Sequence, residues 1–110
     1  MKMIETEDMF KKMISTTEPI IVKFETSWCP DCKRLNQYVD DLVQAFPFQW
    51  YAVDRDQLPK LAERYDVLGI PSLLAFKKSE KIAHLRADNK SPEEIRDFLA
   101  ALAKPADPIL

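Results

Sequence analysis

The apolar and polar positions of the chain first indicate two buried strands with a helix between them. Residues 19–24 (PIIVKF) and 48–54 (FQWYAVD) are mostly apolar runs bounded by turn and breaker residues, which is typical of buried strands. Between these runs, apolar residues recur at the spacing of one helix face, and Pro47 ends the helix. They are Leu35, Val39, Leu42, Val43 and Phe46. A strand, a helix and a strand in this order predict a parallel strand pair with a right-handed crossover.

The second half of the chain contains shorter elements. Residues 58–65 (LPKLAERY) predict a short helix. Residues 72–78 (SLLAFKK) and 81–87 (KIAHLRA) have the composition of two strands, and only Ser79 and Glu80 separate them. So short a connection predicts an antiparallel hairpin.

An amphipathic helix is predicted towards each end of the chain. The C-terminal helix starts with a capping box, in which Ser91 is the N-cap, Pro92 is the first helical residue and Glu94 is three residues after the serine. The apolar face of this helix consists of Ile95, Phe98, Leu99 and Leu102, and that of the N-terminal helix of Met9, Phe10, Met13 and Ile14. We interpret residues 104–110 as a frayed tail. Together the elements predict an α/β fold, a mixed sheet of four or five strands with helices on both faces.

Length and composition limit the chain to one domain. With 110 residues, 46% of them hydrophobic and 31% charged, it can build one core, so we expect a single domain over residues 1–110. The 16 basic and 18 acidic side chains are scattered along the sequence, and this argues against binding to nucleic acid or to an anionic membrane. The first ten residues, MKMIETEDMF, hold no apolar run long enough for a signal peptide or a membrane span. We therefore expect a cytoplasmic protein.

The only two cysteines, Cys29 and Cys32, lie in the segment KFETSWCPDCKRL. In a reducing compartment a close pair of cysteines favours catalysis or metal binding over a structural disulfide. A structural zinc site needs four ligands, and the single histidine, His84, belongs to a different predicted strand. Disulfide exchange is therefore the leading hypothesis and we expect no metal. A metal site shared by two copies of the chain, or two inert buried thiols, stay open as alternatives.

The position of the pair at a helix start suits disulfide exchange. Such a dithiol needs one partly ionised, exposed sulfur that attacks and a second that resolves the mixed disulfide. If Pro30 is the first helical residue, Cys29 caps the helix and the positive end of the helix dipole stabilises its thiolate. Cys32, one turn further on, should be less exposed. The carboxylate of Asp31 opposes the dipole because it disfavours a second negative charge nearby.

The motif WCPDC after an apolar strand, with GIPSLLAF later in the chain, resembles the thioredoxin family from about Met9 to Leu102. The resemblance implies the thioredoxin fold and an enzyme that reduces disulfides in protein substrates. In that reaction Cys29 would be the nucleophile and Cys32 the resolving thiol. Substrates would dock on an apolar surface of Trp28, Ile70 and Pro71, and the family proline that matches Pro71 is cis.

The resemblance also implies how the dithiol is supplied with electrons. A thioredoxin reductase, or another dithiol donor, would reduce the Cys29–Cys32 pair after each turnover. We expect a monomer that needs no bound cofactor. The competing hypothesis is a protein-binding module or redox sensor of the same fold with little turnover, because this fold hosts several functions.

The sequence departs from the usual family pattern at three places. Pro30 and Asp31 stand where thioredoxins typically have a glycine and a proline, which indicates a narrower range of substrates. Lys23 and Ala52 stand where the family has a buried aspartate and its lysine partner. The acid at Asp88 lies where the family has a small apolar patch. It would join Asp31 in favouring basic substrates over acidic ones.

Lys23 has two interpretations. If desolvated beneath the dithiol, its charge would favour a thiolate at Cys32. Alternatively it reaches the protein rim or pairs with Glu25, which shares its strand face two residues further on. The second interpretation needs no role in catalysis.

Overall fold

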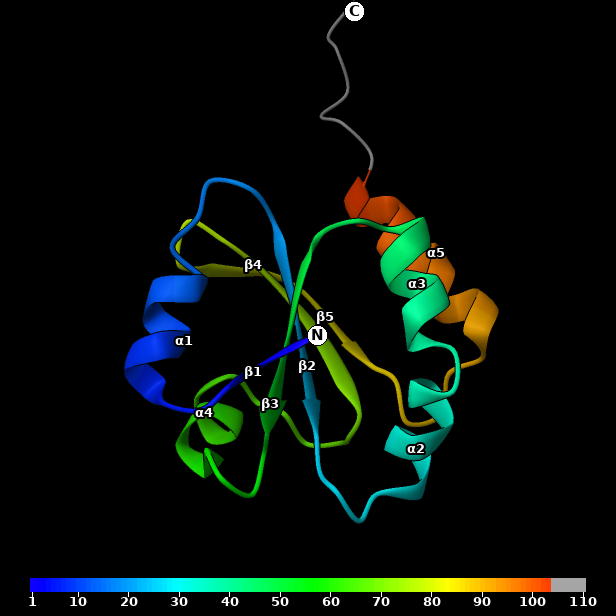
Figure 1. Ribbon diagram of the computed structural model, residues 1–110, viewed down its shortest axis with the longest axis horizontal. Coiled ribbons are helices and arrows are strands. Elements are labelled where there is room, and N and C mark those ends of the chain that lie inside the picture. The colour runs from blue at the N-terminus through cyan, green and yellow to red at the C-terminus, as the bar shows by residue number, and fades with distance from the viewer. Residues whose placement is uncertain (104–110) are drawn as a thin grey trace, which may run out of the picture.

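The computed structural model describes residues 1–103, and the predicted frayed tail at 104–110 lies outside the described residues. A five-stranded sheet runs through the middle of the molecule (Figure 1) in the order β1-β3-β2-β4-β5. Its strands are β1 (Lys2–Ile4), β2 (Ile20–Glu25), β3 (Gln49–Asp54), β4 (Ser72–Lys77) and β5 (Glu80–Arg86).

The sheet is mixed, as predicted. Strands β1 and β2 pair with β3 in parallel, β4 pairs antiparallel with β2, and β5 antiparallel with β4. Strand β2 lies at the centre, and its first five residues are buried, because both faces of this strand are covered. Strand β1 is not among the predicted elements, since its three residues are too few to show a strand period.

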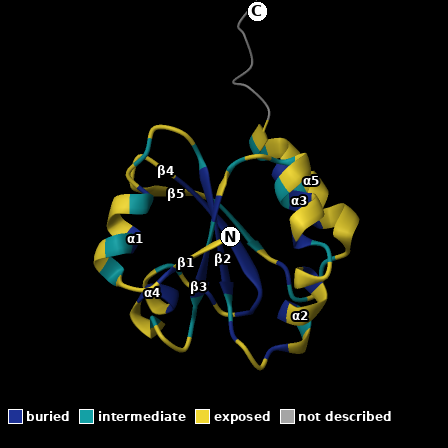
Figure 2. Cartoon of the chain, viewed as in Figure 1, coloured by how far each residue is buried: buried dark blue, intermediate teal, exposed yellow. Residues whose placement is uncertain are grey.

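Five helices cover the two faces of the sheet (Figure 1). They are α1 (Glu7–Met13), α2 (Pro30–Asn36), α3 (Val39–Ala45), α4 (Pro59–Arg64) and α5 (Pro92–Ala103). Helices α1 and α4 pack against one face through a cluster that includes Phe10, Leu61 and Phe76. Helices α2, α3 and α5 pack against the other face through Leu35, Leu42, Ile95 and Leu99, among others. Figure 2 shows the buried strands between helices whose outer faces are exposed.

The prediction of one continuous helix after the cysteines is wrong. The chain forms two helices, α2 and α3, because the last turn of α2 tightens: the amides of Gln37 and Tyr38 donate to the carbonyls of Arg34 and Leu35, three residues back. The apolar face nevertheless continues across the break, since Leu35, Val39 and Leu42 are all buried. The periodicity therefore identified the buried face but not the interruption.

Two predicted local features, a hairpin turn and a helix cap, are found close to where the sequence places them. The hairpin between β4 and β5 turns at Lys78 and Ser79, one residue earlier than predicted, and both have positive φ, 52° and 68°. The capping box of α5 is confirmed. The amide of Glu94 donates to Ser91 Oγ at 3.1 Å, and the amide of Ser91 donates to Glu94 Oε1 at 3.3 Å.

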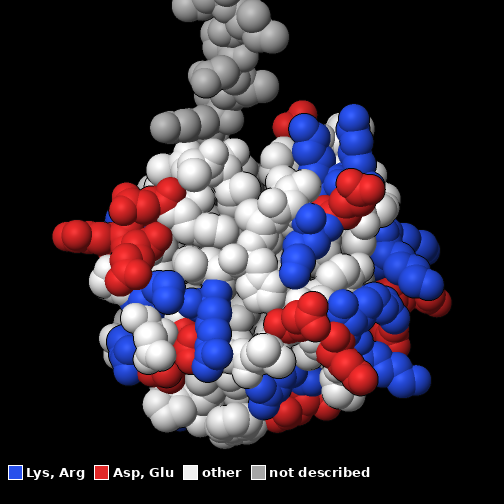
Figure 3. Space-filling model, turned by 180° about the vertical axis from the view of Figure 1, so that it is seen from behind, with Lys and Arg blue, Asp and Glu red and all other residues white. Residues whose placement is uncertain are grey.

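No helix within residues 1–103 has both the length and the apolar character that crossing a membrane requires. On the face seen in Figure 3, basic side chains lie close to acidic ones.

Candidate active site around the dithiol

Cys29 is the N-cap of α2, and Pro30 is its first helical residue, as the sequence predicts. The sulfur of Cys29 accepts a hydrogen bond from the amide of Cys32 at 3.1 Å. This amide is one of the donors that a helix leaves unpaired in its first turn, and a thiolate is stabilised by such a donor. Both cysteines are free thiols.

Cys29 is less accessible than the sequence predicts. Its exposed fraction is 4% and that of Cys32 is 2%. The loop before β4 provides part of the cover, because the carbonyl of Ile70 lies 3.6 Å from the sulfur of Cys29. The peptide bond between Ile70 and Pro71 is cis, as the resemblance implies.

Cys32 faces the interior. Burial raises the pKa of its thiol to about 12, and the side chain of Cys29 and the negative charge of Glu25 act in the same direction. A backbone hydrogen bond at Thr26 acts in the opposite direction. The Cys32 thiol is therefore protonated at neutral pH, whereas the attacking species in disulfide exchange is a thiolate.

Lys23 pairs with Glu25, as the second interpretation of the sequence has it. The Lys23 ammonium lies 2.8 Å from Glu25 Oε1 and donates to Asn36 Oδ1 at 2.5 Å. It does not reach the protein rim, because only 6% of its side chain is exposed. Asn36 in turn donates to Glu25 Oε1 at 3.4 Å, so strand β2 and helix α2 are joined by a closed polar triangle.

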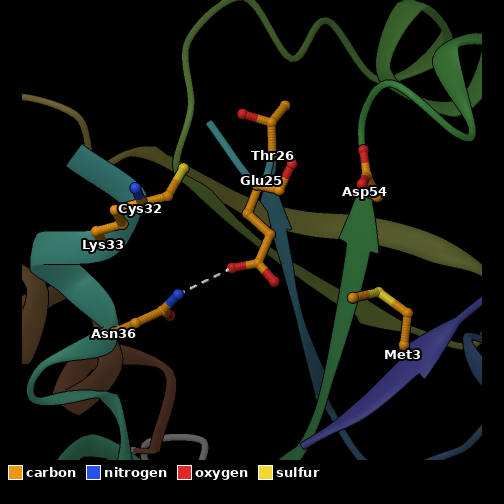
Figure 4. A pocket seen from close by; sticks show the side chains of 8 residues that line it. Met3, Glu25, Thr26, Cys32, Lys33, Asn36 and Asp54 are labelled. Atoms are coloured by element: carbon orange, nitrogen blue, oxygen red, sulfur yellow. Dashed lines mark hydrogen bonds between the residues drawn. The ribbon is translucent and has the colours of Figure 1, made fainter. Parts of the chain in front are cut away.

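A pocket of about 170 Å³ lies beside this triangle (Figure 4). Cys32 lies on its α2 side, and Glu25 and Thr26 lie at the end of β2. Its lining residues are Met3, Glu25, Thr26, Ser27, Cys32, Lys33, Asn36 and Asp54. The hydroxyl of Thr26 is buried and has no hydrogen-bond partner among the residues that the structure describes. A pocket of this size with polar side chains in its lining can hold several water molecules.

Trp28 is 59% exposed and is held by the loop after β3. Its ring N–H donates to Asp56 Oδ2 at 2.8 Å, and the guanidinium of Arg55 lies 5.9 Å from the ring centroid. Ile70 is 9% exposed and Pro71 is buried. The three residues predicted to shape the docking surface therefore differ in access, with only Trp28 projecting into solvent.

The two acidic residues predicted to favour basic substrates are both paired with arginines. Asp31 lies 2.6 Å from Arg34, and Asp88 lies 3.0 Å from Arg86. These contacts offset the acidic charge on which the predicted preference for basic substrates rests. Arg86 also packs over the lone glycine of the chain, because a Cβ on Gly69 would lie 2.2 Å from Arg86 Nε and would displace this guanidinium.

Within residues 1–103, no group of three or more His, Cys, Asp or Glu side chains could hold a metal ion. His84 lies on β5 with its Nδ1 3.0 Å from the Lys81 ammonium. Burial, followed by the charge of Lys81, lowers the pKa of His84 below its usual value, and Asp66 acts weakly against both.

Comparison with known proteins decides the family. The sequence pattern of the Thioredoxin family matches residues 1–101. The chain belongs to the thioredoxin family. It is 30% identical over 97 residues to thioredoxin of Buchnera aphidicola, a match that covers 86% of this chain and 88% of the relative.

Two further thioredoxins show the extent of the likeness. Thioredoxin M4, chloroplastic, of Arabidopsis thaliana is 32% identical over 72 residues, and this match covers 64% of the chain but only 37% of that longer relative. The structure of Plasmodium falciparum thioredoxin superposes with a TM-score of 0.84 at 21% identity, covering 94% of this chain and 100% of the other. The chain therefore has the thioredoxin fold.

The thioredoxin family and the spacing of Cys29 and Cys32 support a thiol–disulfide oxidoreductase function. The family implies protein disulfides as substrates and reductases as electron sources in general. In this member, Lys23, Glu25 and Asn36 form a polar triangle beside Cys32.

Sequence reasoning missed several residues of the site, among them Asn36, Thr26 and Asp56. Asn36 and Thr26 border the pocket of Cys32, and Asp56 holds Trp28. One signal was available for Asn36, which lies one helical turn after Cys32 and therefore on the same side of α2. The contact between Trp28 and Asp56 spans 28 positions of sequence and depends on how two loops meet.

Proposed function

We propose that this protein reduces disulfide bonds in partner proteins, with Cys29 as the attacking thiol and Cys32 as the resolving thiol. The observation that supports this most directly is the capping geometry of α2. It places the Cys29 sulfur 3.1 Å from the amide of Cys32 and 3.6 Å from the carbonyl of Ile70. The attacking sulfur, the resolving residue and a backbone acceptor for a substrate strand thus lie together.

The reaction has two exchange steps. The Cys29 thiolate attacks one sulfur of the substrate disulfide, and the other sulfur leaves as a thiolate, so that a mixed disulfide forms. Cys32 then attacks the sulfur of Cys29 and releases the second substrate thiol. The Cys29–Cys32 pair ends as a disulfide, and an external dithiol donor, in our proposal a thioredoxin reductase, returns it to the dithiol form. No bound cofactor takes part.

Substrates dock on the apolar surface around the dithiol. Trp28 is the exposed anchor, and Ile70 and Pro71 form the floor beside Cys29. Leu68 is 80% exposed and lies just before this loop, so we add it to the docking surface. Pro30 and Asp31 modulate the reactivity of Cys29, since they form the first turn of the helix that it caps. We further propose that the protein acts in the cytoplasm as a monomer.

The competing function is a binding module or redox sensor that cycles slowly. The burial of both thiols, 4% and 2% exposed, favours it, because a covered thiolate meets disulfides less often. The geometry of Cys29 nevertheless suits nucleophilic attack on a disulfide better than the role of a slowly cycling sensor. Its sulfur already receives the amide hydrogen bond that stabilises a thiolate.

Two cysteine variants distinguish these functions. In reduction of a disulfide-containing protein such as insulin with dithiothreitol as electron source, we expect Cys29→Ser to abolish the catalysed rate. Cys32→Ser should accumulate a mixed disulfide with the substrate, detectable as an adduct by mass spectrometry. If both variants keep binding a partner and the unchanged chain does not accelerate reduction, the protein is a binding module.

A further inference from the structure

Resolution by Cys32 requires a proton acceptor. The thiol is 2% exposed, and burial raises its pKa to about 12, so bulk water has little access and the thiolate is scarce at neutral pH. A group that takes this proton as the new sulfur–sulfur bond forms would accelerate the step. Such a group must share a space with the Cys32 side chain.

The pocket of about 170 Å³ provides that space (Figure 4). It joins Cys32 on α2 to Glu25 and Thr26 at the end of β2. Its volume corresponds to several water molecules, and the polar side chains in its lining supply hydrogen-bond partners that such water needs. The buried hydroxyl of Thr26, without a partner among residues 1–103, is one of them. Water in this pocket would therefore connect Cys32 to the β2 side and could carry a proton between them.

We propose that Glu25 accepts the proton of Cys32 during resolution, and that Lys23 and Asn36 position the Glu25 carboxylate for this. The proposal rests on the reductase function described above. One oxygen, Oε1, receives both the Lys23 ammonium and the Asn36 amide. In the part of the chain that the structure describes, no hydrogen bond occupies Oε2, so this oxygen is available to the pocket.

The other charged groups at the pocket suit the role less well. Asp54 is a second carboxylate in the lining, but it lies on β3 and its Oδ1 accepts the amide of Asp56 at 2.8 Å. Glu25, in contrast, is hydrogen-bonded to Asn36, which lies one helical turn after Cys32 on α2. The negative charge of Glu25 also contributes to the raised pKa of the Cys32 thiol. Lys33 also lines the pocket, but a lysine ammonium group is a hydrogen-bond donor without an acceptor site for a proton. Glu25 is thus the best placed acceptor.

The atoms and electrons of the step balance. Cys32 forms a bond to the sulfur of Cys29, and the bond between Cys29 and the substrate sulfur breaks. The electron pair of the broken bond leaves with the substrate sulfur as a thiolate. The Cys32 proton passes through pocket water to Glu25, which then gives it to solvent or to the departing thiolate. The two cysteines lose two electrons, and the substrate disulfide gains them.

The test is a rapid-mixing experiment on the full chain with a disulfide peptide, in which mixed-disulfide formation and resolution are followed separately by acid quench and mass spectrometry. We expect Glu25→Gln to slow resolution roughly 100-fold at neutral pH, the lower end of the range for general-base catalysis, so that the mixed disulfide accumulates. The lost rate should recover as pH rises, because hydroxide then takes the proton. Asp54→Asn is the matched control, and it should resolve at the unchanged rate.

Attack by Cys29 is measured in a Cys32→Ser background with and without Glu25→Gln, and the two rates should be equal because Glu25 acts on Cys32. If Glu25→Gln does not fold, the double variant Lys23→Met with Glu25→Gln removes both charges and carries the same expectation. Resolution at the unchanged rate in a folded Glu25 variant, or equal slowing by Asp54→Asn, would overturn the proposal. Failure of Cys32→Ser to form any mixed disulfide would overturn the reductase function itself.

Discussion

The pair of Lys23 and Glu25 shows how far single residues can be understood from the sequence. That the two lie on the same strand face follows from their spacing, and the structure confirms a contact of 2.8 Å. The third member, Asn36, comes from α2, and its contact with Lys23 depends on the packing of that helix over the strand. Strand periodicity predicts neighbours along β2, whereas it carries no information on which helical side chain closes the triangle.

Removing Lys23 should destabilise the folded protein because it leaves the Glu25 carboxylate without its cation. We expect Lys23→Met to lower the free energy of unfolding by about 2 kcal/mol, less than the roughly 3 to 5 kcal/mol of a fully buried pair, since 16% of the Glu25 side chain is exposed. Urea denaturation measures the change. The double variant Lys23→Met with Glu25→Gln should lose less than the sum of the two single losses, and strict additivity would contradict the coupling.

His84 should make stability depend on pH. Its folded pKa is lowered by burial and by Lys81, so the unfolded chain binds the His84 proton more readily than the folded chain. The His84 contribution to stability is therefore complete above about pH 6.5 and declines as pH falls below it. In urea denaturation at pH 7.5 and pH 5, His84→Asn should lose less stability on acidification than the unchanged chain. Equal losses in both would show that His84 does not contribute.

Among the helices and strands, the sequence identifies those with a long apolar period or a strong capping signal. Strand β2 and the start of α5 are recognised for these reasons. The break between α2 and α3 is not, because Leu35 and Val39 keep the same buried face across it and no Gly or Pro marks the turn. The three residues of β1 become a strand only by pairing with β3, which is a tertiary effect.

The capping box of α5 gives a quantitative prediction. Ser91→Ala removes the oxygen that accepts the amide of Glu94 at 3.1 Å, so we expect a loss of about 1 kcal/mol in the free energy of unfolding. Ser91→Asp keeps an acceptor at the same position and should retain most of the stability in the same denaturation experiment. If the two variants lost equally, the cap would not stabilise the helix.

For the whole molecule, the sheet order brings together residues that lie far apart in the sequence. Cys29 follows the central strand β2, and Ile70 precedes β4, its neighbour in the sheet. The meeting of these two segments could be expected from the family resemblance, and the structure shows it as a contact of 3.6 Å. The pocket behind Cys32 could not be expected, since it is formed by side chains from β1, β2, β3 and α2 that no motif connects.

The reduction potential of the Cys29–Cys32 pair is the measurement that tests the proposed reductase most directly. Equilibration against dithiothreitol or glutathione redox series, followed by the fluorescence of Trp28 one residue before the dithiol, gives this value. A reductase of protein disulfides should have a two-electron transition near the thioredoxin value of about −270 mV. A potential near −120 mV would make the pair an oxidant, and the absence of a two-electron transition with both thiols still titratable would leave only a binding module; either result would contradict the proposed function.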